Sequence, residues 1–127
     1  MQKSVGSWCL VTLGTLLASC APARAHHSLA AFDIVGSLEL SGTVQEFKFT
    51  NPHSYIVMKA KGPDGHVTTW TLEGVAASGL ERDGWNRATL KPGDQIKATI
   101  QPLLSGGAGG SWNPWNIHFQ DGRTVAR

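Results

Sequence analysis

The apolar residues between positions 38 and 49 change phase part-way along, and this shift restricts the fold more than any other sequence feature. They fall on even positions before the shift and on odd positions after it: Leu38, Leu40, Val44, Phe47 and Phe49. Because successive side chains of a strand point to opposite faces, this pattern predicts a β-bulge near Gln45–Glu46. A long, bent first strand suits a small barrel, in which one strand serves both halves of the wall.

Later stretches also have strand-like patterns and are separated by turn signals. They predict strands at 55–60, 67–73, 95–101 and 115–119, with a short closing strand at 124–125. The Gly62–Gly65 turn joins the first two of these as a hairpin. A short helix is expected at 76–83, where Gly84 would cap its C-terminus. The glycine-rich stretch 105–114 is expected to be a flexible loop.

The order of these elements is three strands, a short helix and two strands. It predicts a mainly β fold, namely a small five-stranded OB-like Greek-key barrel with one short helix between strands 3 and 4. A different small barrel or a sandwich is the alternative. Residues 26–127 would form this single domain, of about 100 residues and with one modest core.

Residues 1–25 are typical of a signal peptide and predict a periplasmic or secreted protein. Lys3 precedes the apolar run 8–17, and Ala23-Arg24-Ala25 is a small-residue cleavage site. A second route competes, because Leu17-Ala18-Ser19-Cys20 resembles a lipobox. Cleavage there would make Cys20 a lipid anchor and give a lipid-anchored envelope protein.

Cysteine and charge contents restrict the chemistry of the exported chain. Cys9 and Cys20 are the only cysteines and both precede position 26, so no disulfide or thiolate metal site is expected. The chain has 11 basic and 9 acidic residues, and Lys3 and Arg24 would leave with the signal peptide. The resulting balance argues against a nucleic-acid partner and against docking to anionic lipid.

Cleavage after Ala25 would leave a free amine on His26, followed by His27. The amine and the ring of one histidine can chelate one metal in a histidine-brace arrangement, which needs another imidazole from elsewhere. Cleavage after Arg24 would instead place His27 third, where it could bind Cu(II) through the amine and backbone amides. Both outcomes favour Cu(II), with Zn(II) as the alternative cofactor. The competing interpretation is an ordinary polar terminus.

The remaining histidines differ as candidate ligands. His53 follows Asn51–Pro52 in a loop and could supply the second imidazole or simply bond a carbonyl. His118 could join a site on the barrel wall or be a solvated strand residue. His66 follows a turn and is expected to be exposed.

Two carboxylates and two tryptophans complete the candidate site. Asp33 or Glu73 could orient a ligand imidazole, although each could equally be a surface acid. Trp112 and Trp115 could form an aromatic ligand platform, but we favour a role in capping the barrel end.

Several short motifs resemble those of a family of small exported bacterial proteins of unknown function. They are Ala25-His26-His27-Ser28, Phe32-Asp33, Gly42-Thr43-Val44, Thr50-Asn51-Pro52-His53, Trp70-Thr71-Leu72-Glu73, Gly84-Trp85 and Leu90-Lys91-Pro92-Gly93-Asp94. The resemblance extends over nearly the whole exported chain. It implies a periplasmic, single-domain β-barrel and carries over no activity.

Three functional hypotheses follow. The first is a non-enzymatic periplasmic module that binds copper. The second is an envelope-associated module that binds a peptide, a glycan or a protein and has no metal role. The third and least favoured is a small copper oxidase, because a domain of about 100 residues has little room for a substrate cleft. No nucleophile elbow, catalytic triad or phosphate-binding loop is present in the sequence.

Overall fold

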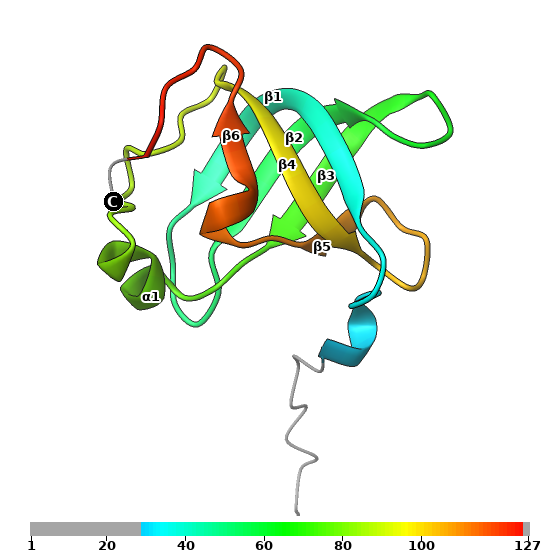
Figure 1. Cartoon of the computed structure of the whole chain (residues 1–127), viewed down its shortest axis with the longest axis horizontal. Coiled ribbons are helices and arrows are strands. Elements are labelled where there is room, and N and C mark those ends of the chain that lie inside the picture. Colours follow the sequence, from blue (N-terminus) through cyan, green and yellow to red (C-terminus); the bar gives the residue numbers. More distant parts are fainter. Residues whose placement is uncertain (1–28, 126–127) are drawn as a thin grey trace, which may run out of the picture.

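The computed structural model describes residues 29–125, which form a β-barrel flanked by short helical segments (Figure 1). In chain order the elements are η1 (Leu29–Ala31), β1 (Leu38–Lys48), β2 (Tyr55–Lys61), β3 (Val67–Glu73), α1 (Ala77–Arg82), β4 (Gln95–Pro102), β5 (Gly109–Ser111), η2 (Pro114–Asn116) and β6 (Ile117–Phe119). The predicted signal peptide, Cys20, His26 and His27 lie outside the described residues. Within the described range, no helix is long and apolar enough to cross a membrane.

Five strands close into a ring in the order β1-β2-β3-β5-β4, and pairing of β4 with β1 completes it. All neighbours in the ring are antiparallel except β3 and β5, which are parallel. The short helix α1 lies between β3 and β4 in the chain. This arrangement confirms the predicted OB-like barrel, in which the first strand takes part in both halves of the wall.

The long first strand bends where the sequence predicted. Leu38 to Thr43 pair with β4, and Gly42 to Lys48 pair with β2. The register with β2 shifts between Val44 and Glu46, which confirms the β-bulge. Gly42 belongs to both ladders, and a Cβ there would lie 2.0 Å from the Lys59 carbonyl oxygen. β1 and β2 can therefore approach each other at this point only because residue 42 has no side chain.

The barrel interior is filled by the apolar faces of the alternating strands. Among its side chains with no exposed surface are Leu40, Val44, Ile56, Met58, Leu72, Leu80 and Ile96. The helix α1 is anchored to this core by Leu80 and ends before Gly84, which has a φ of 80°. A positive φ favours glycine, so Gly84 takes the predicted position after the helix.

The fifth ring strand differs from the prediction. It is β5, which lies inside the glycine-rich stretch that we expected to be a flexible loop. A Cβ at Gly110 would lie 2.6 Å from the Gln101 carbonyl oxygen and 2.7 Å from Ile100 Cδ1. The glycines therefore allow close strand approach, and the prediction of a loop was wrong because glycine content alone suggested flexibility.

The predicted strand at 115–119 is correspondingly shorter and lies outside the ring. Its first part belongs to η2, where the Asn113 side chain accepts a hydrogen bond from Trp115 N and Pro114 begins the turn. Its second part is β6, which pairs with β4 from Ile96 to Ala98. Residues 124–125 are described but form no strand.

Candidate functional site

His53 lies in a short loop between β1 and β2 that its own side chains stabilise. Thr50 Oγ1 donates a hydrogen bond to the His53 carbonyl oxygen (2.7 Å), and Ser54 Oγ donates one to the Thr50 carbonyl oxygen (3.2 Å). Ser54 is fully buried, and the Asn51–Pro52 peptide bond is cis. These contacts fix the position from which the His53 side chain extends.

The loop is also joined to the end of β3. Gly74 N donates to the Ser54 carbonyl oxygen (2.8 Å), and Ser54 N donates to the Val75 carbonyl oxygen (3.0 Å). His53 Nδ1 consequently lies 3.2 Å from the Gly74 carbonyl oxygen and 3.2 Å from Glu73 Oε1. When Nδ1 carries the proton and donates to these oxygens, Nε2 is the basic nitrogen of the ring.

Tyr55 is a further member of this cluster, and we did not predict it from the sequence. Tyr55 is the direct partner of Glu73 in the β2–β3 ladder. Partial burial, followed by the Glu73 carboxylate, raises the pKa of Tyr55 above its usual value of 10.0. Counting outward from the Gly62–Gly65 turn would place Tyr55 opposite Leu72, one residue out of register, so the sequence did not indicate the pairing of Tyr55 with Glu73.

Trp112 packs against the end of β3, which carries Glu73 and Gly74. Its backbone N donates to the Glu73 carbonyl oxygen (2.9 Å), and its indole occupies the space where Gly74 has no side chain. Its ring centroid lies 5.3 Å from that of Trp85 and 6.3 Å from that of Phe47. Trp112 is only 3% exposed and closes the barrel end, so it cannot form the exposed platform that we considered as an alternative.

Asp33 has a local structural role. Its Oδ1 accepts hydrogen bonds from Gly36 N (2.8 Å) and Val35 N (3.2 Å), which stabilises the turn before β1. Its backbone N donates to the Pro102 carbonyl oxygen (2.8 Å). None of these hydrogen bonds brings the Asp33 carboxylate to His53, whereas Glu73 contacts that ring directly.

The segment before β1 nevertheless runs past the same end of the barrel. Gln101 Nε2 donates to the Ile34 carbonyl oxygen (3.3 Å). Ile34, Gln101 and Val75 line one hollow of about 390 Å³, together with Trp112 and Ser111. In Figure 1, η1 and the β1–β2 loop both lie below the barrel. The first described residues are therefore on the side of the molecule where His53 meets Glu73.

The other two histidines in the described range lie elsewhere. His118 is exposed on β6, where it pairs with Lys97. His66 is exposed after its turn, as expected, and its backbone N donates to Asp64 Oδ1 (3.0 Å). Among residues 29–125, no three His, Cys, Asp or Glu side chains are grouped so that they could hold a metal ion. A metal centre at His53 would thus need donors from outside this set of side chains.

Comparison with known proteins identifies a family. No curated protein and no solved structure matches the chain. A family model described as a family of unknown function, DUF6152, matches residues 14–113. The match includes His53 and Trp112, and it ends before Trp115 and His118. Because it spans more than half of the sequence, the chain belongs to this family of unknown function.

Proposed function

We propose that the protein is an exported, non-enzymatic module that binds Cu(II) at the end of its barrel. His26 would supply its amine and ring nitrogens, and His53 Nε2 would supply the second imidazole. His27 would be an auxiliary ligand. The observation that supports this proposal most strongly is the placement of His53 Nδ1, 3.2 Å from both the Gly74 carbonyl oxygen and Glu73 Oε1.

This placement resembles the surroundings of metal-binding histidines in general. Such histidines almost always donate their second ring N–H to a carboxylate or a backbone carbonyl, which fixes the tautomer and makes the other nitrogen more basic. His53 has one acceptor of each kind, and its side chain is 24% exposed. The ring is thus oriented by the protein and still reaches the surface.

The proposal requires the chain before β1 to bring His26 to His53. Glu73 pairs with Ser111, and Ser111 pairs with Gln101, which bonds to Ile34. Neighbouring strands lie about 4.8 Å apart, so these links cover a short distance. Residues 29–34 are not free to extend, because η1, the Phe32–Leu103 bridge and the hydrogen bond from Leu104 N to the Ala31 carbonyl oxygen (3.0 Å) hold them beside the end of β4. Residues 26–28 would therefore have to cover the remaining distance to His53, and three extended residues span about 10 Å.

The donor set selects the metal. An amine and imidazoles are nitrogen ligands, for which Cu(II) has the highest affinity among the common divalent ions, and Zn(II) is the second candidate. His118 is left out of the site because its partner Lys97 is four residues from Gln101, or about 13 Å along β4. Glu73 acts through His53 and is a positioning residue.

The first test is the intact mass of the exported protein, followed by copper titration monitored by electron paramagnetic resonance. A chain that starts at His26 should bind one equivalent of Cu(II) and give a nitrogen-ligated spectrum. A diacylated Cys20 at the start would contradict the proposal, because the His26 amine would then be part of a peptide bond. Binding no tighter than that of a free histidine peptide would also contradict it.

The second test separates His53 from the other histidines. His53→Ala should remove the barrel contribution, and Glu73→Gln should weaken Cu(II) binding about tenfold, as loss of an orienting partner generally does. His66→Ala is the matched control, since it removes an exposed histidine far from the β1–β2 loop along the hairpin. Equal affinities for His53→Ala and His66→Ala would show that the barrel has no part in the site.

A further inference from the structure

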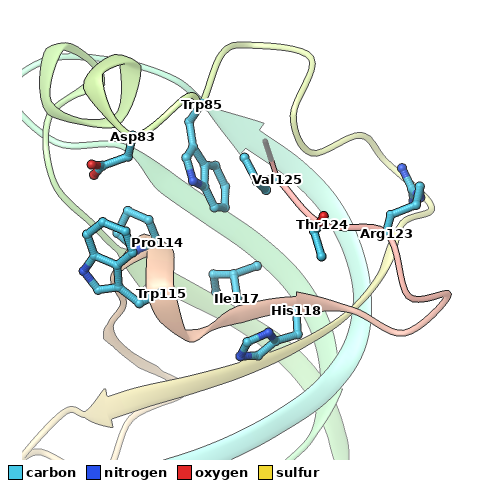
Figure 2. Close-up of a pocket in the computed structure, with 9 residues that line it drawn as sticks. All are labelled: Asp83, Trp85, Pro114, Trp115, Ile117, His118, Arg123, Thr124 and Val125. Atoms are coloured by element: carbon cyan, nitrogen blue, oxygen red, sulfur yellow. The ribbon is translucent and has the colours of Figure 1, made fainter. Parts of the chain in front are cut away.

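A separate hollow lies on the outer side of the barrel, between α1 and β6 (Figure 2). Its volume is about 280 Å³. Trp85 and Trp115 contribute indoles to its wall, Pro114 and Val125 add apolar surface, and Asp83 and Arg123 add opposite charges. Figure 2 shows Asp83, Trp85 and Trp115 toward one end of the hollow, and Arg123 at the other.

The two indoles differ in how they are held. Trp85 is 3% exposed and packs against Phe47 and Trp112, so it forms a rigid part of the wall. Trp115 is 50% exposed, although η2 fixes its backbone through the Asn113 cap. An exposed indole on a fixed backbone can contribute a ring face to a ligand at little cost in conformational entropy.

The charges at the two ends are not equivalent. Arg123 donates to Asp94 Oδ1 (2.7 Å) and Asp121 Oδ2 (2.6 Å), and its guanidinium lies 4.2 Å from the Phe119 ring centroid. Two carboxylates thus neutralise this cation, and Figure 2 shows its side chain directed away from the hollow. Within the described part of the chain, the half-buried Asp83 carboxylate has no hydrogen bond or ion pair. Asp83 is also the only acidic side chain among the described residues that line the hollow.

We propose that this hollow binds a small quaternary ammonium ligand through the Trp115 indole and the Asp83 carboxylate, with the buried Trp85 as the rear wall. Indole faces attract cations, and aromatic walls beside a carboxylate are suited to a methylated ammonium group. A primary ammonium has three N–H donors that need acceptors, whereas a quaternary ammonium has none and is suited to an indole face beside a single carboxylate. The proposal does not depend on the copper site, because it uses neither His53 nor the chain before β1.

The test is titration of the exported protein with choline and with tetramethylammonium, followed by calorimetry and by the NMR shift of the Trp115 indole N–H. Both cations should bind saturably and move this resonance. The neutral control is 3,3-dimethylbutan-1-ol, which has the shape of choline without its charge. It should bind about tenfold more weakly, as expected for loss of a cation–π interaction with a partly desolvated site.

Two variants test which side chains contribute to choline binding. Asp83→Asn and Trp115→Ala should each weaken choline binding about tenfold. Glu81→Gln is the matched control, because it removes the same charge from the exposed side of α1 without lining the hollow, and it should bind like the parent chain. The proposal is overturned if the neutral alcohol binds as tightly as choline, if Asp83→Asn and Glu81→Gln behave alike, or if only neutral sugars shift the Trp115 resonance.

Discussion

Trp112 and Trp115 are close in the sequence and lie in opposite environments. Trp112 follows β5, packs against Gly74 and is 3% exposed, whereas Trp115 lies in η2 and is 50% exposed. The difference arises because β5 already completes the ring. Chain that follows the completed ring is added to its outside, where Ile117 and Phe119 pack into the core but half of Trp115 stays exposed. The barrel end therefore contributes stability, while the outer segment, residues 114–125, also presents accessible surface at Trp115.

The strongest test of this comparison is truncation of each tryptophan. Trp112→Ala removes a large side chain from a closed cluster and should lower the free energy of unfolding by about 3–5 kcal/mol. Trp115→Ala should lower it by only about 1–2 kcal/mol, because half of the residue is already in water. Urea denaturation of both variants measures the difference. Equal losses would mean that the outer segment is part of the cooperative core.

A smaller effect is expected from a methyl group at the barrel end. A Cβ at residue 74 would lie 2.4 Å from Trp112 Cε2, so Gly74→Ala should destabilise the protein by about 1–3 kcal/mol. Gly79→Ala in α1 is the matched control, since its Cβ would meet Val75 at an ordinary 3.7 Å. We expect that change to raise stability by about 0.5–1 kcal/mol through helix propensity. Thermal unfolding should therefore shift in opposite directions for the two variants.

The third prediction concerns alkaline pH. Tyr55 is the only tyrosine, so the ultraviolet absorbance of phenolate reports on it alone. The pKa of Tyr55, measured as the midpoint of this absorbance change, should lie above 10.0. It should be lower in the Glu73→Gln variant, because that substitution removes the neighbouring negative charge. A folded pKa above the unfolded one gives stability that is complete below pH 10 and is lost as pH rises through the folded value. Tyr55→Phe should thus flatten the alkaline fall in melting temperature.

The smallest effect should come from the outer segment. The backbone N–H of Arg123, and then its side chain, lower the pKa of Asp121 below its usual value of 3.8. The stability linked to this shift is present above the unfolded pKa and disappears as pH falls through the folded value. Because the pair is exposed and screened by salt, Asp121→Asn should shift the melting temperature at neutral pH least of all. A large shift would show that the outer segment is more tightly held than its exposure implies.

Much of the barrel could be predicted from the sequence because alternation and turn residues are local signals. The phase shift before Phe47 located the bulge, and the Gly62–Gly65 turn located the β2–β3 hairpin. The fifth ring strand could not be found in this way. Gly109 and Gly110 have no side chains with which to show alternation, and their role depends on Gln101 and Thr71, which are distant in sequence.

The candidate sites were less predictable for a related reason. The contact of His53 with Glu73 depends on how the β1–β2 loop folds against the end of β3, which sequence spacing does not specify. Asp33 was selected for its closeness in sequence to His26, and its carboxylate instead completes a turn. The hollow beside Trp115 forms where the chain after α1 lies beside η2 and β6, so the sequence around Asp83 and Trp85 did not indicate it.

The pairing of β3 with β5 has a consequence for how the barrel opens. This parallel ladder extends only from Thr71 to Glu73, whereas the β2–β3 ladder covers the whole of both strands. Short ladders with few buried side chains exchange their amide hydrogens through small local fluctuations. Amide deuteration should therefore proceed first in the β3–β5 ladder. The amides of the β1–β2–β3 meander should retain their protons until the whole domain unfolds.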